Sequence, residues 1–235
     1  MTMRLATTRS WPNVRWTGQT SIAPVIDLHA YIHRLQLHPL PTLETPVEPG
    51  SLLINPLLSR DVRVQEHVRR FLPSQPPEFW ETERSASNLV PEPIPATFRA
   101  DDDGGFRELG IRIDAGALPP ATPISVSVTG VEGRTFAARS QRANRFALVT
   151  LLGDLRDDAD RSRYLKDCWV VTEVYYVVDA TFRIRTSTGN RPPTSATEVG
   201  IQVRGEGRVD WLDEGTFRIT HHHAIPFAFG GFQVV

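Results

Sequence analysis

Several residue types that often reveal function are scarce in this sequence. Its 235 residues include a single cysteine, which excludes an intrachain disulfide framework and a thiolate-rich metal cluster. No apolar run approaches the about 18–20 residues of a membrane-spanning helix, and no signal-peptide core follows the N-terminus. The 26 basic and 27 acidic residues nearly cancel, so the net charge provides no strong positive potential of the kind that attracts nucleic acids. With a hydrophobic content of 40%, these absences predict a soluble, intracellular, globular protein that binds no nucleic acid.

Motifs of common catalytic and metal sites are also missing. There is no nucleophile elbow, phosphate-binding glycine loop or metalloprotease helix. His29 and His33 have the spacing of a zinc pair on a helix, but no third ligand matches them. The three histidines at residues 221–223 cannot all face one ion from a strand, and a surface or sheet-end cluster is expected for them. Cys168 is expected to be a small buried residue. We therefore expect no enzymatic activity, no metal and no cofactor.

The N-terminal segment, residues 1–43, is distinctly basic. It holds four arginines and two tryptophans, and Asp27 is its only acid. Arginine supplies nearly all basic groups of the chain, since Lys166 is the only lysine, and planar guanidinium groups suit phosphate or carboxylate partners. A helix is expected over residues 21–36. A frayed tail and a mitochondrial presequence are other interpretations of this composition.

Residues 107–136 alternate apolar and polar side chains with the period of a β-strand. They predict a first hairpin, with a proline-containing loop between two strands and one apolar face. That face would consist of Leu109, Ile111, Ile113, Ile124, Val126 and Val128. Apolar residues at helical spacing then predict a helical segment over residues 141–167.

Residues 168–220 form a second hairpin region with two longer alternating runs. In the first run, residues 170–184, one face would be shared by Val174, Tyr176, Val178, Phe182 and Ile184. The second run, residues 199–211, places charges between apolar residues that begin with Val199, Ile201 and Val203. Gly205 and Gly207 leave a second interpretation open, in which a turn divides this run into two ordinary strands.

The length of these runs allows two structural interpretations. Strands in globular proteins have about 5–6 residues, whereas a tilted strand that crosses a bilayer needs about 9–11. An antiparallel sheet with one buried and one solvated face gives the same alternation as a membrane strand. One set of strands serves both states if its apolar faces pack on helices in the monomer and meet lipid in a closed multi-subunit ring.

Short segments spread along the chain resemble the pore-forming N-terminal domain of the gasdermin family and lie in the order of that family. They are IAPVIDLH at residues 22–29, LHPL at 37–40, RYL at 163–165, VVTEV at 170–174, VGIQ at 199–202, AIPFAF at 224–229 and FQV at 232–234. In length the chain is similar to the short fungal regulator-of-cell-death gasdermins. The resemblance implies one pore-forming domain over residues 1–235, without the autoinhibitory domain of animal members. It also implies an α+β fold, a twisted antiparallel β-sheet flanked by helices.

The resemblance also implies a mechanism. A cytoplasmic monomer would bind acidic phospholipids of the phosphoinositide or cardiolipin type on the plasma membrane or another acidic membrane. It would self-oligomerise there, insert its two hairpins into a β-barrel pore and cause lytic, pyroptosis-like cell death. A variant of the same fold is implied as an activating partner. By position, the lipid-binding residues would be Arg4, Arg9, Trp11, Arg15, Trp16 and Arg34. The alternative function is a non-lytic α+β module that binds lipid or protein.

Overall fold

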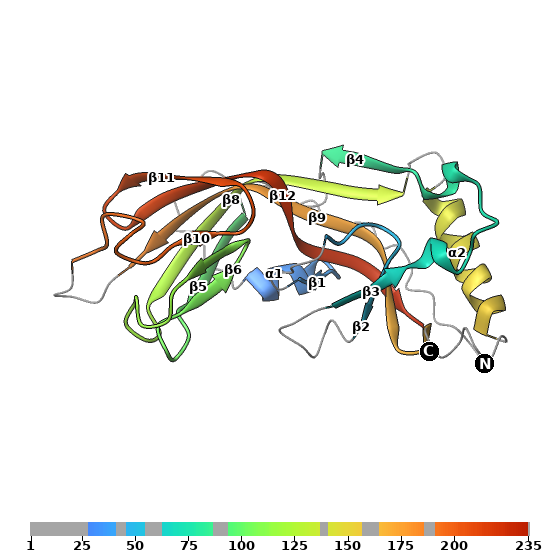
Figure 1. Ribbon diagram of the computed structural model, residues 1–235, viewed down its shortest axis with the longest axis horizontal. Coiled ribbons are helices and arrows are strands. Elements are labelled where there is room, and N and C mark those ends of the chain that lie inside the picture. The colour runs from blue at the N-terminus through green and yellow to red at the C-terminus, as the bar shows by residue number, and fades with distance from the viewer. Residues whose placement is uncertain are drawn as a thin grey trace, which may run out of the picture.

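Three long antiparallel strands organise the computed structural model, which describes residues 28–40, 46–54, 63–86, 94–136, 141–156, 165–185 and 191–234. They are β8 (Pro123–Phe136), β9 (Cys168–Ile184) and β12 (Thr216–Gln233). β9 lies in the centre, with β8 on one side and β12 on the other (Figure 1). The long strand expected over residues 170–184 is confirmed, because β-branched and aromatic residues fill most of β9.

Shorter strands pair with the two ends of this central group. At the end that we call the distal half, β5 (Ile94–Arg99) pairs with the start of β8, and β11 (Gly207–Asp213) pairs with β12. At the opposite, proximal half, β4 (Thr82–Ala86) pairs with the end of β8. There β2 (Ser51–Ile54) pairs with β9 and β3 (Arg63–His67), and β1 (His38–Pro39) pairs with β12.

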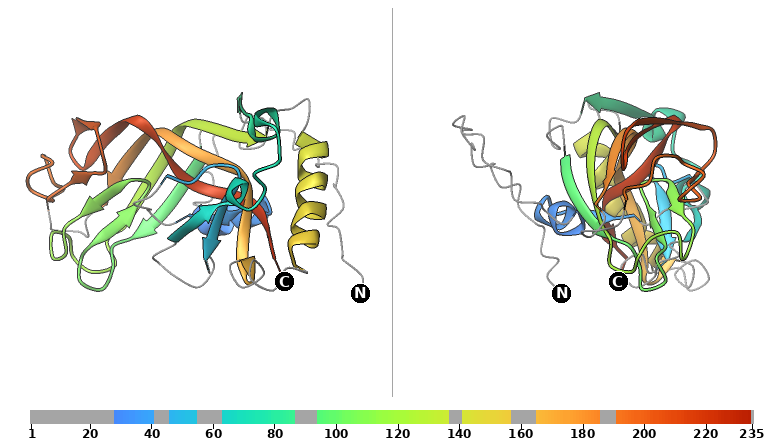
Figure 2. Two further views of the ribbon diagram at one scale, coloured as in Figure 1. Left: turned by 45° about the vertical axis from the view of Figure 1, so that its right-hand side comes forward. Right: turned by 90° about the vertical axis from the view of Figure 1, so that its left-hand side faces the viewer.

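Helices lie around the sheet, and they confirm the expected α+β class. The described helices are α1 (Leu28–Arg34), α2 (Gln141–Arg156) and the short 3-10 turns η1 (Val68–Arg70) and η2 (Pro77–Trp80). α2 stands at the proximal end of the sheet (Figure 2), where Leu148 and Leu152 pack into the core beside Phe136. No helix in the described ranges is long and apolar enough to cross a membrane.

A line of register shifts crosses all three long strands between the two halves. The shifts lie next to Gly130 in β8, at Val178 in β9, and between Thr220 and Ile225 in β12. We call this feature the bulge line. An extra residue in a strand exchanges the faces of all residues beyond it.

The bulge line overturns the single apolar face expected for residues 170–184. Val174 and Tyr176 pack in the proximal core beside Phe229. Phe182 and Ile184 belong instead to the distal core. Tyr175 and Val177, at odd positions, join this distal core, while Val178 lies half-buried at the shift itself.

The predicted first hairpin over residues 107–136 is wrong in its pairing. Residues 111–113 do not pair with β8. They form β7 (Ile111–Ile113), which pairs with β6 (Phe106–Glu108) through a two-residue turn. The turn residues Leu109 and Gly110 have φ values of 50° and 75°, and two positive values favour a tight hairpin.

The second alternating run is divided, as the glycine interpretation allowed. β10 (Gln202–Val203) and β11 are separated by a bend at Gly205, whose φ is 65°. Val199 and Ile201 lie outside the strands. β10 pairs with β7, so the return strand beside β9 is β12 and not residues 199–211.

Candidate functional site

The distal half of the sheet has one apolar face and one polar face across five strands. Directly opposite residues in neighbouring strands project to the same face, so each cross-strand row belongs to one face of the sheet. One apolar row consists of Ala96, Val126, Phe182, Phe217 and Trp211. The next apolar row consists of Ile94, Val128, Ala180, Ile219 and Val209.

The row between them contains Ser127, Thr181, Arg218 and Asp210, with Pro95 as its β5 member. A polar row on the other side of the first apolar row consists of Thr97, Ser125, Arg183, Thr216 and Asp213. The polar side chains of these rows are exposed or half-buried. The five strands thus form a sheet with one apolar face and one polar, solvent-facing face.

Aromatic side chains fill the apolar face. Phe217 stacks between Phe182, at 5.2 Å and 9°, and Trp211, at 5.1 Å and 17°. Phe182 and Phe217 are fully buried. Burial of such a large side chain stabilises the fold by about 1.5–3 kcal/mol relative to exposure, so this face needs a cover in water.

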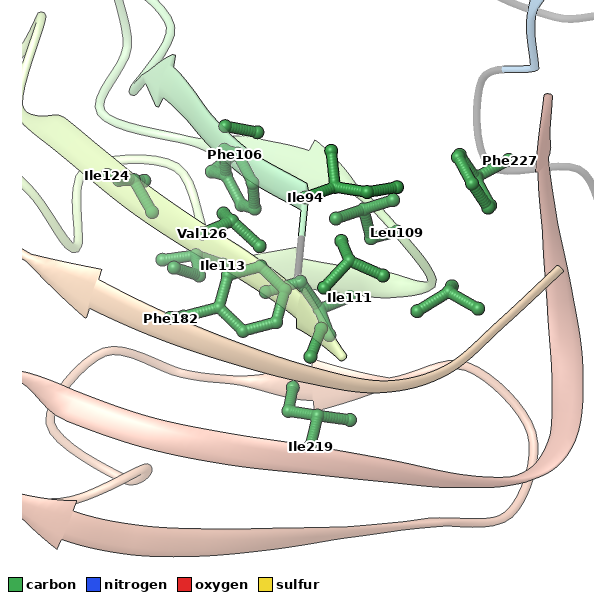
Figure 3. Packing of buried hydrophobic residues seen from close by; sticks show 14 of the residues in the cluster. Ile94, Phe106, Leu109, Ile111, Ile113, Ile124, Val126, Phe182, Ile219 and Phe227 are labelled. Atoms are coloured by element: carbon green, nitrogen blue, oxygen red, sulfur yellow. The ribbon is translucent and has the colours of Figure 1, made fainter. Parts of the chain in front are cut away.

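A small second sheet supplies that cover, together with Ile32 of α1. It contains β6, β7 and β10, and we call it the clasp. Phe106, Ile111 and Ile113 project from the clasp toward Ile124, Val126 and Phe182 (Figure 3). The expectation that helices cover the apolar faces is therefore wrong here, although α2 does cover the proximal end.

The clasp is built from two connecting segments of the distal half. β6 and β7 lie in residues 100–122, between β5 and β8, whereas β10 lies in residues 185–206, between β9 and β11. The two connectors hold each other through the pairs Arg112–Gln202 and Ile111–Val203. The Arg204 amide also donates to the Gly110 carbonyl at 2.9 Å.

In this structure the predicted hairpin residues of the distal half form two layers. Ile124, Val126, Val128, Phe182 and Ile184 lie on the sheet, whereas Leu109, Ile111, Ile113, Val199, Ile201 and Val203 pack against it from the connectors. The residues predicted for the two hairpins included none from β5, β11 or β12, although Val209 and Trp211 of β11 lie in the predicted run 199–211. The alternating residues Phe217 and Ile219 carried the signal for β12.

An open groove of about 320 Å³ lies at the tip of the distal half. Its lining combines Arg183 and Arg185 with the apolar side chains of Ile184 and Pro192 and with Glu214. Arg191 approaches Glu214 at 3.9 Å. Two exposed guanidinium groups at the same groove can contact a phosphate group.

The N-terminal candidates Arg4, Arg9, Trp11, Arg15 and Trp16 lie outside the described residues. Arg34 lies in the last turn of α1 with an exposed side chain. Ile32 of the same helix is buried in the distal core, which turns part of α1 toward the sheet.

The histidine cluster at residues 221–223 is split by the strand geometry. His222 and His223 are exposed, but His221 is only 2% exposed, so a surface position is wrong for it. Cys168 is buried, as expected, and its thiol donates to the Gln65 Oε1 atom at 3.0 Å. Burial raises the pKa of this thiol, and Asp167 adds to the effect. Within the described ranges, no three potential ligands converge on a metal site.

Comparisons with known proteins bear on the fold. No protein-family model and no curated protein matches the sequence. Among solved structures, a bacterial gasdermin from Bradyrhizobium tropiciagri matches with a TM-score of 0.50 and 11% sequence identity. The match covers 88% of this chain and 85% of that one. The chain therefore has a gasdermin-like α+β fold.

Proposed function

We propose that this chain is a gasdermin-type pore-forming protein, related to the fungal members, with no reaction of its own. In this proposal the chain binds acidic phospholipids, self-assembles on the membrane and inserts the ribbons β5–β8 and β9–β12 to permeabilise it. Lytic cell death is the proposed consequence. The observation that carries the proposal is the row-by-row separation of apolar and polar residues across five distal strands.

The distal strands need additional length to cross a bilayer. Beyond the bulge line β9 offers only residues 179–184, whereas a crossing strand has about 9–11 residues. The connectors can supply the missing residues if the clasp dissolves and its segments extend the ribbons. Clasp release would uncover the apolar face and lengthen the strands in one step.

The unpaired edges of the sheet are the reason why membrane insertion requires self-assembly. In the described part of the chain, β5 pairs only with β8, and β11 pairs only with β12. Hydrocarbon does not tolerate unpaired backbone groups, so inserted ribbons require neighbours on both sides and closure into a β-barrel. A second copy of this chain, or a variant of the same fold, would provide these neighbours.

Arginine-rich surfaces support the choice of lipid. Arg34 is exposed on α1, and Arg183 and Arg185 line the distal groove. Each arginine near an anionic surface contributes about 1 kcal/mol to binding. We propose phosphoinositide- or cardiolipin-type lipids as the target and a cytoplasmic monomer as the form that moves to the membrane.

Dye release from vesicles tests the proposal. The full chain should release dye from vesicles with acidic lipids and leave neutral vesicles intact. Replacing Arg183→Ala together with Arg185→Ala should weaken binding to acidic vesicles roughly tenfold or more, at about 1 kcal/mol per arginine. Arg69→Ala, at an exposed proximal position, is the matched control and should bind as the natural chain does. Tight binding without leakage under every condition would instead identify a non-lytic binding module.

A further inference from the structure

His221 is buried where the clasp meets the central sheet. It lies in β12 at the bulge line, and its Nε2 atom donates to the Leu109 carbonyl at 3.1 Å. The next residue, Gly110, approaches so closely that a Cβ atom there would lie 2.8 Å from the imidazole Cε1 atom. The tight turn of the clasp therefore rests directly on the His221 ring.

The second ring nitrogen of His221, Nδ1, has no acceptor among the described residues to which a proton on it could be hydrogen-bonded. Because Nε2 donates to a carbonyl, the neutral ring carries its proton there and leaves a lone pair on Nδ1. Nδ1 is buried and has no hydrogen-bond partner in the described part of the chain. Ile225 also packs at this point. A proton on Nδ1 would create a buried charge and a buried donor without an acceptor, and both are unfavourable.

The charged groups on the elements around His221 do not remove this penalty. The charged or titratable residues next to His221 or its partners in sequence or in strand pairing include Glu108 beside the clasp turn, Arg204 and Glu206 before β11, Arg208 on β11, Asp179 on β9, and His222 and His223 on β12. Burial lowers the pKa of His221, while the Leu109 hydrogen bond and the charge of Asp179 oppose this shift more weakly. The Asp179 carboxylate already accepts a hydrogen bond from the Thr220 hydroxyl at 2.7 Å.

We propose that His221 is an acid-sensitive pin, whose neutral imidazole holds the clasp on the distal apolar face and whose protonation releases the clasp. The closed form binds fewer protons than the open form, in which the ring regains an ordinary pKa of about 6.5. The closed form is therefore fully stable above this pH and loses stability as the pH falls below it. The ratio of closed to open molecules should fall by up to about tenfold per pH unit until the lowered pKa is reached.

This inference rests on the proposed function only for its consequence, since release would free the ribbons for insertion. The release itself can be measured without a membrane. Hydrogen exchange of the full chain, followed by mass spectrometry and corrected for intrinsic rates, reports clasp opening through peptides that cover residues 106–113 and 202–209. These peptides should exchange up to about tenfold faster at pH 5.5 than at pH 7.5.

Two variants identify the ring that is responsible. His221→Gln can still donate to the Leu109 carbonyl but cannot be protonated, so its clasp should exchange alike at both pH values. His222→Gln, at the adjacent exposed position, should behave like the natural chain. Equal clasp exchange in the natural chain at both pH values, or a pH response that survives His221→Gln, would overturn the inference.

Asp179→Asn gives a second test if His221→Gln opens the clasp at every pH. The asparagine keeps an acceptor for Thr220 but removes the charge that favours a protonated ring. The clasp of this variant should exchange like that of the natural chain at pH 7.5 but should continue to open faster to a lower pH, because the closed-form ring is harder to protonate. A clasp exchange rate that levels off at the same or a higher pH than in the natural chain would contradict the pin. Dye release, measured in parallel, separates the two proposals. Faster exchange at low pH without leakage from acidic vesicles would support the role of His221 and contradict the pore-forming function. Leakage with unchanged exchange would support the pore-forming function and contradict the role of His221.

Discussion

The distal and proximal halves of the sheet share the same three long strands but are covered in different ways. In the proximal half, α2 packs with Leu148 and Leu152 near Phe136. A separate proximal cluster joins Tyr176 to Leu40, Val47 and Phe229. The distal apolar face lies mainly under the clasp, which the chain itself supplies from two connectors. One half is therefore covered by a helix and by its own cluster, and the other by connectors, which the proposed function expects to move away.

Polar contacts reinforce the difference between the halves. The Tyr176 hydroxyl donates to the Val47 carbonyl at 2.5 Å, and the Arg134 guanidinium lies 4.3 Å from the centre of the Tyr176 ring. Burial raises the pKa of Tyr176 to about 12, so this hydroxyl stays protonated over the physiological range. In the clasp, by contrast, β10 contributes only two residues to its ladder.

A disulfide that locks the clasp should have the largest effect. Arg112 and Gln202 are exposed and directly opposite in the β7–β10 pair, so Arg112→Cys with Gln202→Cys places two thiols within reach of each other. We expect the oxidised variant to bind acidic vesicles without releasing dye, and a reductant to restore release. Each single variant is a control, and the buried Cys168 should not interfere. Undiminished leakage from the oxidised form would show that the apolar face need not be uncovered.

Truncation of one buried phenylalanine in each half sharpens the comparison. Phe182 and Phe229 are both fully buried, in the distal and proximal cores respectively. Replacing either with alanine should lower the free energy of unfolding by about 3–5 kcal/mol in denaturant titrations. Only Phe182→Ala should also accelerate hydrogen exchange in the clasp. Equal acceleration by Phe229→Ala would mean that the two halves open as one cooperative unit.

A pair of glycine substitutions gives the smallest expected effect and isolates the contact beneath the clasp. Gly110 and Gly205 have φ values of 75° and 65°, so alanine at either position costs roughly 1–2 kcal/mol of backbone strain. At Gly205 no atom lies within 4 Å of the added Cβ, whereas at Gly110 it would meet the His221 ring. Gly110→Ala should therefore lower the free energy of unfolding more than Gly205→Ala does. Equal losses in the free energy of unfolding for the two variants would mean that the His221 ring can move away from the added Cβ atom without destabilising the fold.

The residue pattern was sufficient to predict the class of the fold and its longest strand. Strict alternation from Thr181 to Ile184, with an apolar run before it, identifies β9 whatever its neighbours are. The pattern was not sufficient to predict pairing. Ile111 and Ile124 both alternate correctly, yet one lies in the clasp and the other on the sheet beneath it. Periodicity states which residues share a face, but long-range contacts select the partner strand.

By itself, the sequence determined that strands would be long and two-faced, and it left open a bend at Gly205 that would divide the second run. These properties depend on local side-chain alternation and on backbone freedom at single residues. Only the tertiary structure decided that the bulge line would exchange the faces of β9, that two connectors would close over the distal core, and that His221 would lie beneath them. Each of these depends on register between segments far apart in the chain, and a shift of one residue changes every contact that follows.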